Sequence, residues 1–311
     1  MFLLVPDPLS SVELNFSTDM VWVMNLCIAI IMFSVALSMK REDFSALVKH
    51  PKQVLVGLTG QFFLLPAVTF LLVMALKPYP GLALGMVLVA CVPGGNVSNY
   101  FTLVGKGNPA LSVTITAIAT LIAPILTPLN FSFWGGNIPF ASELFRSINL
   151  DFWKMFQSVM LMLVSPMILG LLFAKHFPKI TDKIKSKMQR LALMILVAFI
   201  VFAFSGNYRL FMEYYQHIIY LVFLHTLLAL GAGYVWGALL TRDRVVARTI
   251  SIETGIQNSG LGLVLIFSLF DGQGGMALVT AWWGVYDIFS GLCAAYFFRW
   301  LSQRNTVLGV A

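Results

Sequence analysis

The chain has 311 residues, of which 59% are hydrophobic and only 11% are charged, whereas soluble domains carry about 25% charged residues. This balance excludes a water-soluble globular protein and predicts an all-α membrane protein in contact with lipid. The net charge of +7 fits basic loops at one membrane surface, so we expect no nucleic-acid partner.

Nine apolar segments approach the roughly 20 residues that a helix needs to cross a bilayer. In chain order they are residues 20–39, 53–76, 81–104, 109–134, 152–174, 189–205, 214–240, 246–270 and 276–298. We therefore predict nine transmembrane helices in a single unit that covers residues 1–311.

The basic residues orient these spans. Of the 20 Lys and Arg residues, all but Lys77, Arg146, Lys154 and Arg209 fall on one side of the membrane. Because basic residues gather on the cytoplasmic side, this asymmetry predicts an N-terminus outside and a C-terminus in the cytoplasm.

The third span is interrupted. Pro93-Gly94-Gly95 removes a backbone donor and weakens the helix, and the polar residues Asn96, Ser98 and Asn99 follow at once. Inside a membrane, freed backbone groups are tolerated only where protein or a wet cavity satisfies them. The break therefore indicates a functional interior site.

The eighth span is polar at almost every second position from Ser251 to Gly260. Spans three and eight are five apart, an odd number, so they cross the membrane in opposite directions. This arrangement predicts an inverted-topology repeat in which two discontinuous helices cross at the membrane centre. The alternative is two kinked helices in an ordinary bundle, but a kink requires Pro or Gly and not the accompanying polar side chains.

Only two of the 13 acidic residues, Glu253 and Asp287, lie well inside predicted spans. An unpaired carboxylate at the bilayer centre costs on the order of 3 kcal/mol or more, so both are functional candidates. Glu253 stands beside the break, where the carbonyls of Thr254 and Ile256 are freed. Carboxylate, carbonyl and amide oxygens together suit a hard cation, and we expect no transition-metal site.

Further oxygen donors occur at compatible places. Gln61 lies in the second span, Ser112 and Thr116 share one face of the fourth, and Gln257 follows Glu253. The second halves of the broken helices begin near Asn96 and Asn258, where free amide donors attract an anion.

The segments Cys91-Val92-Pro93-Gly94-Gly95 to Ser98-Asn99 and Glu253-Thr254-Gly255-Ile256-Gln257-Asn258-Ser259-Gly260 resemble the bile acid:sodium symporter family. The resemblance extends from about Met24 to Phe298, in the nine-helix form of a bacterial-type homologue. It implies a sodium symporter of organic anions, such as bile acids or small carboxylates, which works by alternating access.

The resemblance also implies two sodium ions and the residues that bind them. The first set is Ser98, Asn99, Ser112, Thr116 and Glu253. The second set is Gln61, Glu253, Thr254, Ile256 and Gln257, with Thr254 and Ile256 acting through their carbonyls. Asn258 and the backbone near Asn96 match positions that bind the substrate, and Asp287 falls at a substrate-side position where the chain departs from the family pattern. Where bacterial relatives resemble Trp-His-Asn, this chain reads Tyr286-Asp287-Ile288, an acid that would repel a carboxylate unless protonated or paired.

The same resemblance implies a core domain of approximately 53–134 plus 214–298 and a panel domain of approximately 20–39 plus 152–205. It implies a multi-pass monomer in lipid, in the plasma membrane (the bacterial inner membrane). Asp287 keeps open a proton-coupled or uncoupled organic acid carrier of the same fold. An intramembrane hydrolase using Glu253 and Asp287 is disfavoured, because the sequence has no nucleophile–base set and no His-Glu-x-x-His motif. We therefore expect that the protein is not an enzyme.

Overall fold

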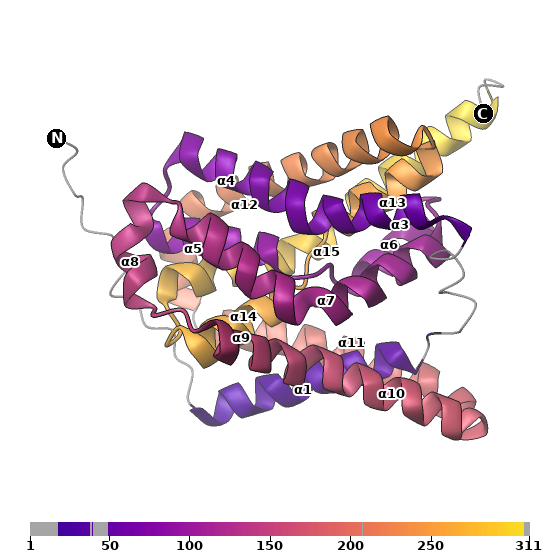
Figure 1. Cartoon of the computed structure of the whole chain (residues 1–311), viewed down its shortest axis with the longest axis horizontal. Helices are drawn as coiled ribbons and strands as arrows, with labels where there is room; N and C mark the ends of the chain where they lie inside the picture. Colours follow the sequence, from indigo (N-terminus) through magenta and orange to yellow (C-terminus); the bar gives the residue numbers. More distant parts are fainter. Residues whose placement is uncertain (1–17, 38, 40–48, 207, 308–311) are drawn as a thin grey trace.

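The computed structural model describes residues 18–37, 39, 49–206 and 208–307 (Figure 1). Within these ranges the regular elements are helices, without a β-strand. They are α1 (Thr18–Ala36), α3 (Pro51–Thr59), η2 (Gly60–Leu64), α4 (Leu65–Leu76), α5 (Pro80–Cys91), α6 (Val97–Val104), α7 (Pro109–Gly136), η3 (Pro139–Ala141), α8 (Ser142–Ser147), α9 (Phe152–Val159), η4 (Met160–Val164), α10 (Ser165–His176), α11 (Pro178–Gly206), α12 (Tyr208–Thr241), α13 (Arg244–Gly255), α14 (Ser259–Leu269) and α15 (Gly274–Val307). Both chain ends, residue 38 of the first predicted span and the basic residues Lys40 and Arg41 lie outside the described residues.

Each predicted span has a helical counterpart in the described part of the chain. The helices α11, α12 and α15 extend beyond their predicted spans, because their charged flanks continue the helix outside the apolar stretch. Lys, Arg and Glu are good helix formers, so charge ends a hydrophobic run without ending the helix.

By length and composition, five stretches of the described residues suffice to cross a membrane: Pro51–Leu76, Pro109–Gly136, Phe152–His176, Ile218–Thr241 and Gly274–Arg304. Shorter apolar helices occur at Asn25–Ala36, Pro80–Cys91 and Ser259–Leu269. The last two are halves of the interrupted spans, which explains why neither is long enough alone.

The predicted interruptions are present. Helix α5 ends at Cys91 and α6 begins at Val97, while α13 ends at Gly255 and α14 begins at Ser259. The two breaks are joined through their backbones: Gly95 N donates to Ile256 O and Asn258 N donates to Pro93 O, both at 3.0 Å. The paired breaks satisfy some of the polar groups that interruption frees, and they exclude two merely kinked helices.

Glycine is required where the breaks meet. A Cβ added to Gly95 would lie 2.8 Å from the backbone oxygen of Gln257. A Cβ added to Gly94 would lie 2.5 Å from Nε2 of Gln61. The contact at Gly95 is with backbone, which cannot rotate away, so only glycine at this position lets the two segments approach this closely, whereas the Gln61 amide opposite Gly94 is the end of a flexible side chain.

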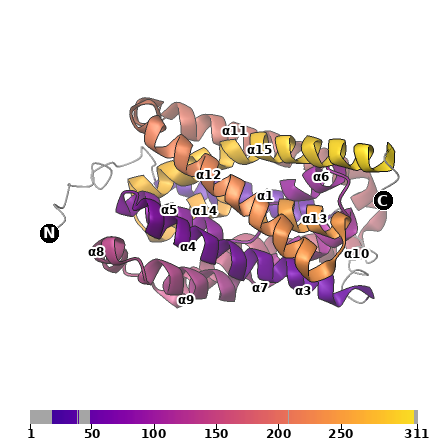
Figure 2. The ribbon, with the colours of Figure 1, turned by 90° about the horizontal axis from the view of Figure 1, so that it is seen from above.

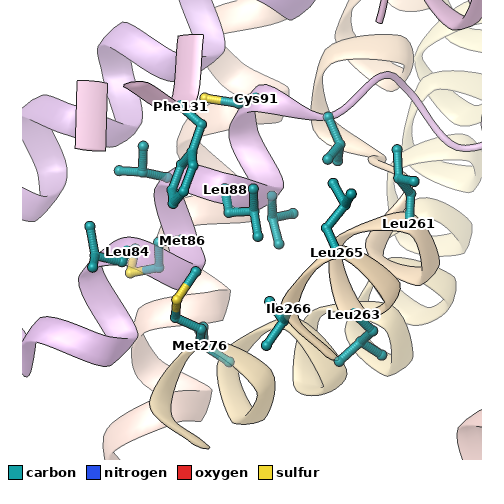
Figure 3. Close-up of a cluster of buried hydrophobic side chains, with 14 of the residues drawn as sticks. Leu84, Met86, Leu88, Cys91, Phe131, Leu261, Leu263, Leu265, Ile266 and Met276 are labelled. Atoms are coloured by element: carbon teal, nitrogen blue, oxygen red, sulfur yellow. The ribbon is translucent and has the colours of Figure 1, made fainter. Parts of the chain in front are cut away.

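The core surrounds α5, in which every residue from Gly81 to Cys91 is buried. Figure 3 shows apolar side chains of α5 together with those of α7, α14 and α15, among them Leu88, Phe131, Leu265 and Met276. A helix that is apolar on all sides can face lipid or be buried in protein, and α5 is buried among other helices of the chain. The first half of the interrupted span is therefore held by protein rather than by lipid.

Two groups of helices can be followed in the figures. Helix α1 packs against α10 and α11, which with α9 lie along the lower edge of Figure 1. Helix α12 packs along α13 and also contacts α4 and α15, and Figure 2 shows it running obliquely between α15 and α4. The paired breaks lie in the larger group, which contains α3 to α7 and α12 to α15.

A π-helical turn, η2, precedes Pro66 in the second predicted span. Pro66 has no N–H to donate to the carbonyl of Phe62, four residues earlier. The side-chain amide of Asn130 in α7 donates to that carbonyl instead, at 2.8 Å. Because the Asn130 side chain replaces the missing backbone donor, the helix continues past Pro66, and Gln61 lies in the widened π-helical turn.

We expect Asn130→Ala to lower the free energy of unfolding by about 1–3 kcal/mol, because the Phe62 carbonyl would lose its donor in a poorly hydrated place. Thermal unfolding in detergent measures the loss. Asn137→Ala is the matched control, since Asn137 bonds within its own exposed helix end, to Phe133 O at 2.6 Å. Equal losses for the two variants would contradict the role assigned to Asn130.

Candidate ion and substrate site at the helix breaks

The Glu253 carboxylate is completely buried, in the last turn of α13. Its Oε1 accepts hydrogen bonds from Ser98 Oγ at 2.6 Å and from Ser112 Oγ. Its Oε2 accepts from Thr116 Oγ1 at 2.8 Å and from Gln61 Nε2 at 3.2 Å. Side chains from η2, α6 and α7 thus meet at one carboxylate. Because the Glu253 carboxylate is buried among them, it does not point into lipid.

The oxygens around Glu253 outnumber the protons available to join them. Ser112 Oγ lies 2.8 Å from Asn99 Oδ1 and 3.3 Å from Thr102 Oγ1, in addition to its contact with Glu253. Thr116 Oγ1 lies 2.8 Å from Glu253 Oε2 and 3.4 Å from Asn99 Oδ1. Each hydroxyl has one proton to give, so some of these oxygens face lone pairs. A hard cation with oxygen ligands would balance this cluster.

Thr102 was absent from the residues predicted for the site. It is fully buried in α6 and its hydroxyl approaches Ser112. The available signal was its position four residues after Ser98, which places both side chains on one helix face.

A second group of oxygens lies beside the break of α13. Gln61 Nε2 donates to Glu253 O at 3.0 Å, and Gln257 Nε2 donates to Thr254 O at 2.8 Å. The Oε1 atoms of Gln61 and Gln257 and the Oγ1 of Thr254 are buried without a hydrogen-bond partner among the described residues. Each unsatisfied oxygen costs about 1–3 kcal/mol, which a bound cation would recover.

The carbonyl predicted at Ile256 already accepts the hydrogen bond from Gly95 N. A carbonyl oxygen has two lone pairs, so this bond leaves room for one further partner. Ile256 therefore lies at the break, and its carbonyl oxygen would bind a cation in addition to the N–H of Gly95.

Asn258 caps α14, with its Oδ1 accepting from Leu261 N at 3.0 Å. Asn258, Ser259 and Gly260 are partly exposed, so the start of this helix is within reach of a ligand. Asn96 differs: its Nδ2 donates to Met32 Sδ of α1 at 3.4 Å and makes no cap bond to α6. The two predicted substrate-side asparagines thus have different local roles.

Asp287, in α15, is only 5% exposed. Its Oδ2 accepts from the backbone N–H of Gln257 at 3.3 Å, and its Oδ1 is buried without a partner in the described chain. The acid expected near the cargo is therefore hydrogen-bonded to the backbone of the break itself.

Residues 25–214 match the family described as Sodium Bile acid symporter family. An uncharacterized sodium-dependent transporter YocS of Bacillus subtilis (strain 168) is 32% identical over 285 residues, which are 86% of each chain. A probable chloroplastic sodium/metabolite cotransporter BASS2 of Oryza sativa subsp. japonica is 32% identical over 235 residues, 76% of this chain and 54% of the relative. A probable chloroplastic sodium/metabolite cotransporter BASS1 of Arabidopsis thaliana is 28% identical and covers 76% of this chain and 57% of the relative.

Proposed function

The chain belongs to the sodium bile acid symporter family, a family of sodium-dependent membrane transporters, and from that premise we propose that it carries organic anions together with sodium ions. The observation that supports this most strongly is the buried oxygen cluster around Glu253, which has more acceptors than protons. The names of the relatives, a sodium-dependent transporter and sodium/metabolite cotransporters, agree with a cation at this place.

Two sodium ions share the Glu253 region in this proposal. The first is bound by the cluster that joins Glu253 to α6 and α7, namely Ser98, Asn99, Ser112 and Thr116. The second is bound next to the break by the group Gln61, Glu253, Thr254, Ile256 and Gln257. The Oε1 atoms of Gln61 and Gln257 support the second ion, because they are buried, have no hydrogen-bond partner among the described residues and would be satisfied by a cation.

The organic anion binds at the start of α14, beside Asn258. The first amides of a helix have no intrahelical acceptors and carry the positive end of the helix dipole, so they favour a carboxylate. Asn96 lies across the break, near α1. Sodium and anion are then neighbours, which makes the binding of each depend on the other.

Transport proceeds by alternating access in a nine-helix inverted repeat, with the N-terminus outside and the C-terminus in the cytoplasm of a monomer in the plasma membrane. The core domain, approximately 53–134 plus 214–298, moves against a panel domain of approximately 20–39 plus 152–205. The extensive packing of α1 against α10 and α11 supports this division, and α1 also meets the break-carrying helix α14, where the two domains would be in contact.

The energy available is sufficient for accumulation. Two sodium ions with one monovalent anion move one net charge, worth about 2.3 kcal/mol at 100 mV. Each tenfold sodium gradient adds roughly 1.4 kcal/mol. The sum of about 5 kcal/mol corresponds to an accumulation of several thousand-fold.

Uptake into proteoliposomes tests the coupling ion. A thermal-shift screen of organic anions, with and without sodium, first selects a labelled substrate. We expect uptake of this substrate to require an inward sodium gradient and to cease when choline replaces sodium, at both of two external pH values. Uptake in choline that follows the pH gradient would contradict sodium coupling and favour the proton-coupled carrier; uptake indifferent to both gradients would favour the uncoupled one.

A further inference from the structure

Asp287 has a charge that the proposed sodium sites do not use. Only 5% of its surface is exposed, and one of its two carboxylate oxygens, Oδ1, has no hydrogen-bond partner among the described residues. The ion pair found in that part of the chain joins Lys185 to Asp182, on the exposed start of α11. Within the described ranges Asp287 is therefore a buried acid without a basic partner, a costly arrangement within a membrane protein.

The helix break does not require this charge. Among the described residues, the contact that Asp287 makes with the break is the hydrogen bond that Oδ2 accepts from Gln257 N, while the Trp283 side chain, four residues earlier in α15, also lies close to the carboxyl group. The side-chain oxygen of asparagine would accept the same bond in the same place. The negative charge and the second oxygen, Oδ1, must therefore serve something other than closing the break.

Helix α15 brings Asp287 close to the start of α14, where the anion is proposed to bind. Gly284, three residues before Asp287, approaches Ser259 so closely that an added Cβ would lie 2.8 Å from Ser259 Oγ. Three residues correspond to roughly 5 Å along a helix. Amide donors for a carboxylate and an acid with a free oxygen thus lie within the span of one small molecule.

A bare metal cation fits this place poorly. Sodium prefers several oxygen ligands, as the cluster at Glu253 provides. At Asp287 the contacting group is an N–H donor, which repels a cation. An alkylammonium group differs, because it brings its own N–H donors and needs only an acceptor.

We propose that Oδ1 of Asp287 binds a protonated amine of the substrate, so that the transported molecule is a zwitterion with its carboxylate at the start of α14. This inference rests on the proposed function and narrows its substrate class from organic anions to amino-substituted carboxylates. The acid then attracts the substrate's ammonium group instead of repelling its carboxylate.

Matched pairs of compounds test this inference. The probes are leucine against 4-methylpentanoate and 4-aminobutanoate against butanoate, added to the purified protein in sodium buffer. Affinity is read from thermal stabilisation and from competition for uptake. We expect at least one amino compound to bind about 30-fold or more tightly than its partner, the effect of a buried charge pair.

Asp287→Asn should remove this preference while sodium alone still stabilises the protein. Asp271→Asn is the matched control, since it makes the same chemical change at an exposed turn after α14. A wild-type preference for the unsubstituted acids, binding of neither member of any pair, or an unchanged preference in Asp287→Asn would each overturn the inference. So would a variant that loses its response to sodium, which would make Asp287 a cation ligand.

The two proposals fail in different ways. Stabilisation by the amino compounds without any sodium-dependent uptake would contradict the proposed function and leave the role of Asp287 standing. Sodium-driven uptake of simple carboxylates in preference to their amino-substituted partners would support the proposed function and contradict the role assigned to Asp287.

Discussion

Replacing Glu253 by glutamine or alanine is expected to reduce sodium-dependent uptake by roughly 100-fold or more, because both proposed ions lose their one charged ligand. Glutamine has the shape of glutamate, but its amide would turn a donor toward Gln61 or toward the hydroxyls that now donate to the carboxylate. Initial rates of uptake into proteoliposomes, with sodium replaced stepwise by choline, measure the effect.

Folding must be followed in the same variants. Because the carboxylate is buried and not paired with a base, its removal relieves the cost of burying a charge, and we expect Glu253→Ala to remain folded and monodisperse in detergent. Glu143→Gln, in the exposed short helix α8, is the matched control and should transport normally. Full sodium-dependent transport by either Glu253 variant would remove Glu253 from the cation site.

Gly95→Ala is expected to abolish transport and to lower the free energy of unfolding by about 2–4 kcal/mol. The added methyl group would meet backbone atoms of Gln257 at 2.8 and 3.2 Å, and backbone cannot rotate away as a side chain can. The two breaks must therefore separate, which lengthens the hydrogen bonds from Gly95 N and Asn258 N.

Gly231→Ala provides the comparison. A Cβ at Gly231, within α12, meets nothing within 4 Å. Alanine is the better helix former by up to about 1 kcal/mol, so this variant should keep its transport and gain slightly in thermal stability. Should Gly95→Ala behave like Gly231→Ala, close contact between the breaks would not be needed for function.

The sequence was sufficient to predict a helical membrane protein and the places where two of its helices are interrupted. Apolar length locates a span, and Pro93-Gly94-Gly95 or the polar run around Glu253 interrupts it, so each signal is contained in one segment. Helix ends were less accurate at α11, since hydropathy measures contact with lipid whereas a lysine-rich helix continues into water.

Contacts between segments far apart in the sequence could not be predicted from hydropathy and helix periodicity. Asn130 supplies the hydrogen-bond donor that Pro66 lacks, and it lies 68 residues after Phe62 in the sequence. Nothing in the sequence near Pro66 indicates that Asn130 is the donor. The bond between Asp287 and the backbone of Gln257 likewise depends on how α15 packs against the break. Periodicity describes one helix face at a time, whereas these bonds depend on the relative placement of two helices.

The burial of α5 on all sides could not be read from its composition either. An apolar helix facing lipid and an apolar helix inside protein have the same sequence character. The packing of α7, α14 and α15 around it decides between them.

Binding of radioactive sodium to the purified protein is the most direct test of the central claim, that the buried oxygens at the paired breaks bind sodium. We predict saturable binding of two sodium ions per chain, displaced by unlabelled sodium but not by choline, and lost in Glu253→Gln while Glu143→Gln binds normally. Absence of saturable sodium binding to the folded wild-type protein, or undiminished binding in Glu253→Gln, would contradict the account.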